Sequence, residues 1–66
     1  EEVLVNRKYA DSKGDIYMVT AIARDAETLE ELVIYKSLYG NNETWARPKS
    51  IFTGTADGKP RFRLVD

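Results

Sequence analysis

Hydrophobic and polar residues alternate along much of this chain in the way that is typical of short β-strands. The clearest segment is Ile16 to Arg24, which is rich in β-branched and aromatic residues and contains neither glycine nor proline. Simple alternation gives this segment two faces, Tyr17, Val19, Ala21 and Ala23 on one and Ile16, Met18, Thr20 and Ile22 on the other. Because both faces are mostly apolar, we expect a central strand that is covered on both sides along part of its length.

Shorter strands are expected on either side of this segment. Val3-Leu4-Val5 opens a β-prone stretch that ends near Tyr9, and residues 11–15 contain the Asp, Ser and Gly that are typical of a turn. Further along, Trp45-Ala46-Arg47 predicts a short strand, and Pro48 restricts the residue before it to extended geometry.

The C-terminal part of the sequence predicts one helical turn and one more strand. Residues 48–52 indicate a single 3₁₀ turn with either Ile51 or Phe52 pointing inward. Residues 53–58 read as a polar loop that ends in Asp-Gly, a common hairpin signal. Residues 61–65 predict the last strand.

The segment from Asp25 to Gly40 fits two structures. As a helix, it would have Asp25 as N-cap and Gly40 as its C-terminal stop, with Leu29, Leu32 and Val33 at helical spacing. As a hairpin, residues 25–30 would form a polar turn and residues 31–39 a strand that contains the β-prone sequence Val-Ile-Tyr. Lys36 interrupts the helical stripe, but the pattern alone leaves both structures open.

Length and composition limit the kind of protein this can be. Sixty-six residues make one small domain, residues 1–66, whose marginal core would gain from self-association. With no cysteine and no histidine there is no disulfide framework, and no metal site built from thiolate or imidazole is expected. The same absence removes the usual catalytic bases and thiol nucleophiles, so we expect neither an enzyme nor a cofactor.

Charge and hydropathy point to an ordinary soluble protein. No apolar run is long enough to span a membrane, and the acidic start differs from a signal peptide, so a cytoplasmic location is expected. The net charge is −1, but residues 1–45 hold five basic and nine acidic side chains, a net of −4. Residues 46–66 hold five basic and two acidic side chains, a net of +3, which forms either a basic patch or a solvated polar face.

An ordered set of short motifs runs through residues 9–64: a Tyr then Lys-Gly, Tyr-x-Val, Ala-Arg, Glu-Thr, Leu-Val-x-Tyr, Leu-Tyr-Gly, Trp-x-Arg-Pro and Phe. The set resembles a family of small bacterial proteins known as domain of unknown function 1653. The matching positions are Tyr9, Lys13, Gly14, Tyr17, Val19, Ala23, Arg24, Glu27, Thr28, Leu32, Val33, Tyr35, Leu38, Tyr39, Gly40, Trp45, Arg47, Pro48 and Phe52.

The resemblance implies a fold but no activity. It implies a small, mostly β protein, an SH3-like barrel of about five antiparallel strands, and it therefore favours the hairpin for residues 25–39. One position departs from the family pattern, because the usual histidine is replaced here by Asp11. A role that depends on that imidazole is therefore not expected of this protein.

The aromatic residues between Tyr35 and Pro48 can be placed in two ways. If residues 31–39 form a strand, one face carries Leu32, Ile34 and Leu38 and the other carries Val33, Tyr35 and Tyr39. With the leucine face inward, the tyrosines would lie outside beside Tyr17 or Trp45, as a binding site or a dimer seam. With the tyrosine face inward, they would be core residues with their hydroxyls at the rim.

From these patterns we expect a non-catalytic binding module that engages a protein partner or a second copy of itself through an aromatic surface. The alternative is binding of single-stranded nucleic acid, with bases stacked on aromatic rings beside arginines, although the pI of about 5.4 counts against it. The candidate binding residues are Tyr17, Tyr35, Tyr39, Trp45, Arg47, Arg61 and Arg63.

Overall fold

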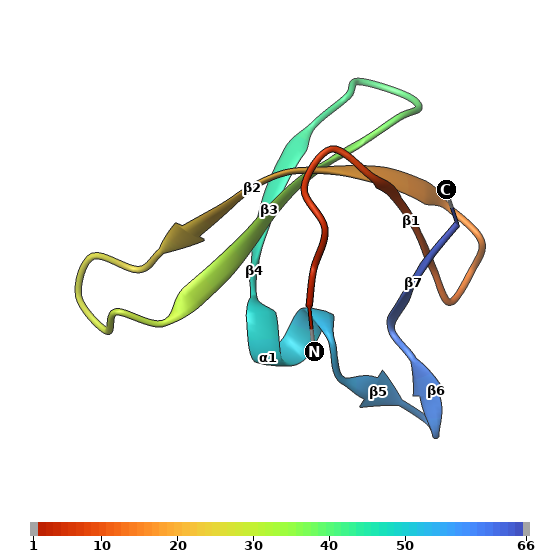
Figure 1. Ribbon diagram of the computed structural model, residues 1–66. Coiled ribbons are helices and arrows are strands. Elements are labelled where there is room, and N and C mark those ends of the chain that lie inside the picture. Colours follow the sequence, from red (N-terminus) through yellow and green to blue (C-terminus); the bar gives the residue numbers. More distant parts are fainter. Residues whose placement is uncertain (1, 66) are drawn as a thin grey trace.

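The chain folds into a bent antiparallel sheet with one short helix (Figure 1). The computed structural model describes residues 2–65. Its elements are β1 (Lys8–Asp11), β2 (Ile16–Arg24), β3 (Glu31–Ser37), β4 (Thr44–Pro48), α1 (Lys49–Phe52), β5 (Thr55–Ala56), β6 (Lys59–Pro60) and β7 (Phe62–Leu64). Five strands form one sheet in the order β4-β3-β2-β1-β7, and β5 and β6 form a separate small hairpin. The predicted mostly β fold class is confirmed.

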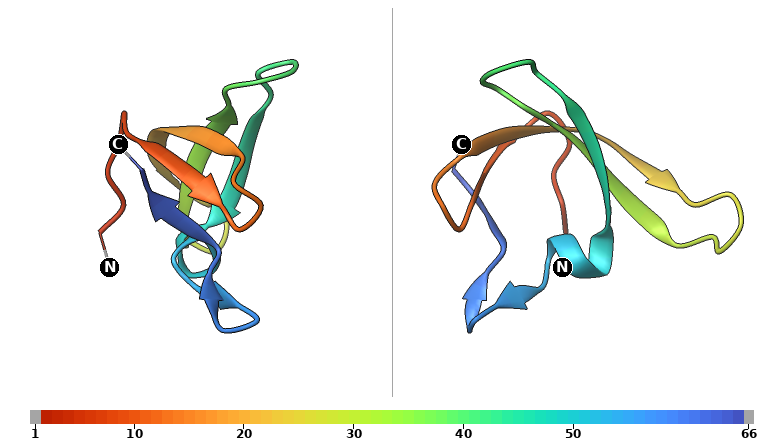
Figure 2. Two further views of the ribbon diagram at one scale, coloured as in Figure 1. Left: turned by 90° about the vertical axis from the view of Figure 1, so that its right-hand side faces the viewer. Right: turned by 180° about the vertical axis from the view of Figure 1, so that it is seen from behind.

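The expected closure into an SH3-like barrel is not found, because the sheet formed by the described residues is open. Its two edges are β4 and β7, which have no ladder between them. The segment that joins these edges is taken up by α1 and the β5–β6 hairpin, and the right-hand view in Figure 2 shows it running from the end of β4 to the start of β7. A proline in β4 and a length of only three residues in β7 are typical of edge strands.

The hairpin formed by β2 and β3 is confirmed, and the helix considered for this segment is excluded. The two strands pair antiparallel from Tyr17 opposite Ser37 to Arg24 opposite Glu31. A hairpin about the turn at residues 25–30 predicts either Ile22 or Ala23 as the neighbour of Val33, and Ile22 is the residue found opposite it. The strand ends at Ser37, two residues earlier than expected.

The turn between β2 and β3 is organised by the side chain of Asp25. Its carboxylate accepts hydrogen bonds from the backbone N–H of Thr28 (3.1 Å) and of Glu27 (2.8 Å), and these bonds lower the pKa of Asp25. The backbone N–H of Leu29 reaches the Asp25 carbonyl oxygen, and Leu29 adopts a φ of 65°. A leucine at positive φ is strained, because its Cβ approaches the carbonyl oxygen that follows it.

A β-bulge in β2 changes which side chains share a face. The register shifts between Val19 and Ala21, so Thr20 has no partner in the ladder, and its hydroxyl donates instead to the carbonyl oxygen of Ile34 at 3.2 Å. Beyond the bulge Ile22, opposite the inward-facing Val33, joins the face that carries Val19. The two faces expected from simple alternation are therefore wrong for the second half of β2.

The concave face of the sheet carries the core. Its buried members are Val3, Tyr9, Val19, Val33, Tyr35 and Phe52, and Tyr17 and Phe62 pack against them. On β3 the face of Val33 and Tyr35 points inward, although the opposite face, with leucine and isoleucine, is the more apolar one. Of the two arrangements considered for β3, the structure therefore has the one in which the tyrosine face points inward.

Two short segments also differ from expectation. The segment with Val3 contributes to the core but is not a strand, because Asn6 adopts a φ of 65° and breaks the extended backbone before β1. Residues 49–52 form one turn of α-helix rather than a 3₁₀ turn, since the Thr53 N–H reaches the Lys49 carbonyl four residues back. Of the two candidates for the inward position, Phe52 is the buried one.

Candidate aromatic and arginine site

Side chains from several strands converge on a small pocket at the end of the core. The pocket has a volume of about 160 Å³, and we call it the tyrosine–arginine pocket. Its lining residues are Asp11, Ser12, Tyr17, Tyr35, Arg47, Ala56, Arg61 and Phe62. The sheet brings them together because β1, β2 and β3 are consecutive neighbours, while Arg47 comes from β4 and Arg61 directly precedes β7.

Arg47 is held in place by the core. It shares the concave face with Tyr35, since Val33 on β3 is its ladder partner. Its Nε donates a hydrogen bond of 3.1 Å to the Tyr35 hydroxyl, and its guanidinium carbon lies 5.9 Å from the centre of the Phe62 ring. Tyr35 is buried, so this bond satisfies a hydroxyl that the core encloses and fixes the direction of the guanidinium.

Tyr17 occupies the opposite wall of the pocket. Its hydroxyl lies 3.4 Å from the Tyr39 hydroxyl and donates to the Asp11 carboxylate at 3.3 Å. The hydrogen bond with Tyr39, partial burial and the negative charge of Asp11 together raise the pKa of Tyr17 well above the ordinary tyrosine value. The Tyr17 hydroxyl therefore stays protonated and acts as a hydrogen-bond donor.

Two large aromatic rings flank the pocket and are open to solvent. Tyr39 is 51% exposed and packs edge-on against Tyr17, with 6.2 Å between the ring centroids. Trp45 is 47% exposed and lies directly opposite Tyr35 in the ladder between β3 and β4. We call Tyr17, Tyr39 and Trp45 the tyrosine–tryptophan surface; Tyr35, on the strand between those of Tyr17 and Trp45, is buried.

The remaining arginine candidate, Arg63, lines a neighbouring hollow that shares Asp11 and Ser12 with the pocket. Arg63 is opposite Ala10 in the ladder with β1, while its neighbours Phe62 and Leu64 point to the concave side. It does not line the tyrosine–arginine pocket. Four of the candidate residues, Tyr17, Tyr35, Arg47 and Arg61, thus meet at one pocket, two flank it, and Arg63 lines the neighbouring hollow.

A family model described as "Protein of unknown function (DUF1653)" matches residues 7–64. The chain belongs to this family. The match confirms the resemblance seen in the sequence motifs, and several of those motif residues, including Tyr17, Tyr35 and Arg47, line the pocket. No curated protein and no solved structure matches the sequence.

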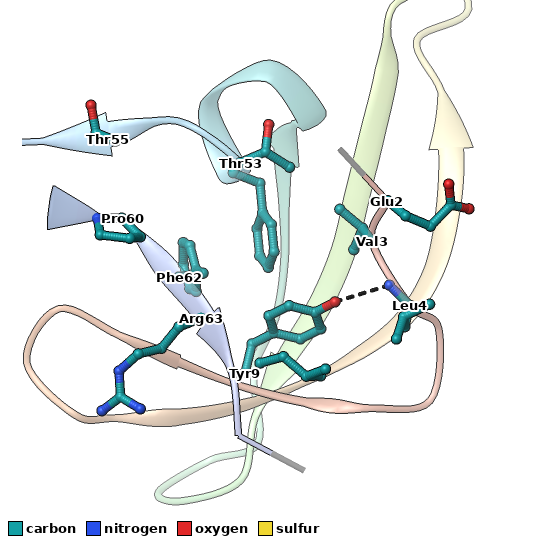
Figure 3. Close-up of a pocket in the computed structure, with 11 residues that line it drawn as sticks. Glu2, Val3, Leu4, Tyr9, Thr53, Thr55, Pro60, Phe62 and Arg63 are labelled. Atoms are coloured by element: carbon teal, nitrogen blue, oxygen red, sulfur yellow. Dashed lines mark hydrogen bonds between the residues drawn. The ribbon is translucent and has the colours of Figure 1, made fainter.

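This DUF1653 protein also has a larger groove, which Figure 3 shows. It has a volume of about 440 Å³ and an apolar floor that includes Tyr9, Phe52 and Phe62. The Tyr9 hydroxyl accepts a hydrogen bond of 2.9 Å from the Leu4 N–H, which holds the N-terminal segment at one side of the groove. The groove lies beside β7, at the open edge of the sheet.

Sequence reasoning misses four contributors to the tyrosine–arginine pocket, Asp11, Ser12, Ala56 and Phe62. The local pattern assigns Asp11 and Ser12 to a turn, and Phe62 to the hydrophobic side of a strand. Asp11 does hold that turn, since its carboxylate accepts hydrogen bonds from the N–H groups of Lys13 and Asp15. Nothing in the local pattern indicates that its second carboxylate oxygen faces a tyrosine from another strand.

The described residues offer no sign of metal chemistry or of a membrane span. Within residues 2–65, no group of three or more histidine, cysteine or acidic side chains is placed to hold a metal ion. The same residues contain no helix that is long and apolar enough to cross a membrane.

Proposed function

We propose that this DUF1653 protein is a non-catalytic binding module that engages a protein, either a partner or a second copy of itself, through the tyrosine–tryptophan surface. The observation that carries the proposal is the exposure of two large rings, Tyr39 at 51% and Trp45 at 47%. Exposed groups of apolar residues mark interaction sites, and tyrosine, tryptophan and arginine are enriched at the centres of protein interfaces.

The surroundings of these rings support binding rather than a reaction. The sequence has no histidine or cysteine. The Tyr17 hydroxyl beside these rings has a raised pKa, so it is less readily deprotonated than an ordinary tyrosine. Meanwhile Tyr17 and Tyr35 pack edge to face at 5.3 Å, so the exposed rings rest on a rigid support that loses little conformational entropy on binding.

Sedimentation velocity over a concentration series tests the self-association branch. We expect mass to rise with concentration in the wild type and to stay monomeric in Trp45→Ala and Tyr39→Ala, both of which should remain folded because their rings are exposed. Ile51→Ala is the matched control, since Ile51 is 41% exposed but lies on α1, outside the surface.

Selection from a displayed peptide library tests the partner branch. Peptides that bind the wild type should lose binding to Trp45→Ala and keep it to Ile51→Ala. The proposal fails if the wild type is monomeric up to high micromolar concentration and no selected peptide distinguishes these two variants.

Single-stranded nucleic acid is a second candidate, favoured by the location of Arg47 and Arg61 beside aromatic rings. This second proposal includes a relationship of the fold to SH3-like small barrels, because some of those barrels bind nucleic acid by stacking its bases on aromatic side chains. Fluorescence anisotropy with a mixed oligonucleotide would test it. Binding should weaken as salt rises, because each phosphate contact releases counterions. No binding at low salt removes this candidate and leaves the first one unaffected.

A further inference from the structure

The tyrosine–arginine pocket has an excess of positive charge that the rest of the described protein does not neutralise. Arg47 and Arg61 both line it, and neither forms an ion pair with any residue in the described range 2–65. By contrast Arg24 and Lys49 both lie within 4 Å of the Glu31 carboxylate, at 3.9 and 3.5 Å.

Asp11, the one acidic residue that lines the pocket, is already engaged. One of its carboxylate oxygens accepts from two backbone N–H groups of the β1–β2 turn, and the other accepts from the Tyr17 hydroxyl. It therefore lowers the charge of the pocket without pairing with either arginine. Two arginines and one aspartate leave a net charge of +1.

The arginine N–H groups are available to a ligand. Arg47 uses its Nε for the Tyr35 hydroxyl, and no bond from its two terminal nitrogens to a described residue is present. Within residues 2–65 no buried side-chain nitrogen or oxygen lacks a partner, so the free N–H groups of Arg47 and Arg61 face solvent. The guanidinium group presents its donors as a planar fork, which matches the two oxygens of a carboxylate.

The volume and the net charge of the tyrosine–arginine pocket together limit the ligands that it can bind. A volume of about 160 Å³ admits one small group rather than a whole drug-sized molecule. A net charge of +1 is matched by a monoanion, whereas a phosphate monoester carries about −1.5 to −2 at neutral pH. A nucleic-acid strand would need a series of basic contacts along its backbone, whereas two arginines line this pocket.

We propose that the tyrosine–arginine pocket binds one carboxylate group of the protein partner, from an acidic side chain or the C-terminal residue, with Arg47 and Arg61 as the residues that contact it. This inference rests on the proposed function and names the chemistry of its partner. The exposed rings of the tyrosine–tryptophan surface would cover the residues next to that carboxylate, which excludes water and strengthens the ion pair.

Titration of isotope-labelled protein with acetate, followed by NMR of the arginine Nε–Hε groups at constant ionic strength, tests the pocket directly. We expect saturable shifts for Arg47 and Arg61 and none for Arg24, which is paired with Glu31 at the other end of β2 and serves as an internal control. Arg61→Gln should weaken acetate binding about 10-fold or more, the effect of losing one charge-assisted hydrogen bond. Arg24→Gln removes the same charge at the other end of β2 and should change binding less than about twofold.

Two further probes distinguish the sources of an anion. Dimethyl phosphate is a monoanion that represents a nucleic-acid backbone, and inorganic phosphate represents a phosphorylated side chain. Shifts of Arg47 and Arg61 with either phosphate but not with acetate would overturn the carboxylate assignment. So would the absence of saturable shifts with acetate in the wild type.

The failure of this inference can be told apart from failure of the proposed function. Trp45 lies outside the pocket lining, so Trp45→Ala should abolish protein association and leave the acetate shifts unchanged. If association depends on Trp45 but acetate does not bind, the binding module stands and the carboxylate site does not. If acetate binds and nothing associates, the pocket is an anion site, but its assignment to a protein partner fails together with the proposed function.

Discussion

Replacing Phe52 by alanine tests whether the packed rings hold this fold together. Phe52 is 2% exposed, stacks on Phe62 with 4.2 Å between ring centroids, and meets Tyr9 and Tyr35 edge-on at 5.5 and 5.4 Å. Loss of a buried phenylalanine ring to alanine costs about 3–5 kcal/mol, because apolar burial is lost and a cavity remains. A domain of this size has a total stability of roughly 3–10 kcal/mol, so Phe52→Ala should lose a third of it or more.

Urea unfolding followed by far-ultraviolet circular dichroism measures this loss. Phe52→Leu keeps much of the burial but loses the ring contacts, and it should cost about 1–2 kcal/mol. Ile51→Ala is the matched control from the same helical turn; Ile51 is 41% exposed, so we expect a change within about 0.5 kcal/mol. If Phe52→Ala lowers the free energy of unfolding no more than Ile51→Ala does, the ring cluster is not the core and the reasoning is refuted.

Three other variants test local features. Leu29→Gly should stabilise the protein by up to about 1 kcal/mol in urea unfolding, because glycine accepts the φ of 65° without strain and the leucine side chain is exposed. Tyr39→Phe should lower the pKa of Tyr17, measured by ultraviolet titration of tyrosinate. In the wild type, the raised pKa contributes stability that is fully present below pH about 10, the ordinary pKa of tyrosine, and is lost as the pH rises through the pKa of Tyr17 in the folded protein. In Asp25→Asn, the urea concentration at the unfolding midpoint should decrease less at low pH than in the wild type. The lowered pKa of Asp25 contributes stability that is present above the ordinary pKa of aspartate and is lost as the pH falls through the pKa of Asp25 in the folded protein.

Each of these expectations has a result that contradicts it. Leu29→Ala keeps the strained backbone angle, so an equal gain from alanine and glycine would assign the effect to the side chain instead. An unchanged titration of Tyr17 in Tyr39→Phe would show that the bond between the two hydroxyls does not form. If stability decreases at low pH in Asp25→Asn as much as in the wild type, the Asp25 carboxylate is not a source of the pH dependence.

Local features of the fold could be predicted, because the sequence signals for them lie close together. The β2–β3 hairpin is favoured by a polar turn between two β-prone segments together with the family resemblance, and the turn limits the neighbour of Val33 to Ile22 or Ala23, of which Ile22 is found. The Asp57-Gly58 pair likewise marks the β5–β6 hairpin, and both residues adopt positive φ.

Features that depend on distant parts of the sequence could not be predicted. The bulge at Thr20 reverses the alternation within β2, and its compensating bond goes to a carbonyl oxygen on β3. The inward face of β3 is the less apolar one because Tyr35 finds a ring on α1 and an arginine on β4. Asp11 joins the pocket only because the sheet brings it to Tyr17, and no local pattern carries that information.

The ring cluster also determines when this protein can fold during its synthesis. Tyr9, Tyr35 and Phe52 leave the ribosome first, but the ring that stacks on Phe52 belongs to Phe62, on the strand β7 that is made last among the described elements. Until β7 emerges, β1 lacks its outer neighbour and three aromatic residues have no cover on one side. The nascent polypeptide therefore exposes part of its core until β7 has been made, and apolar surface exposed in this way favours aggregation.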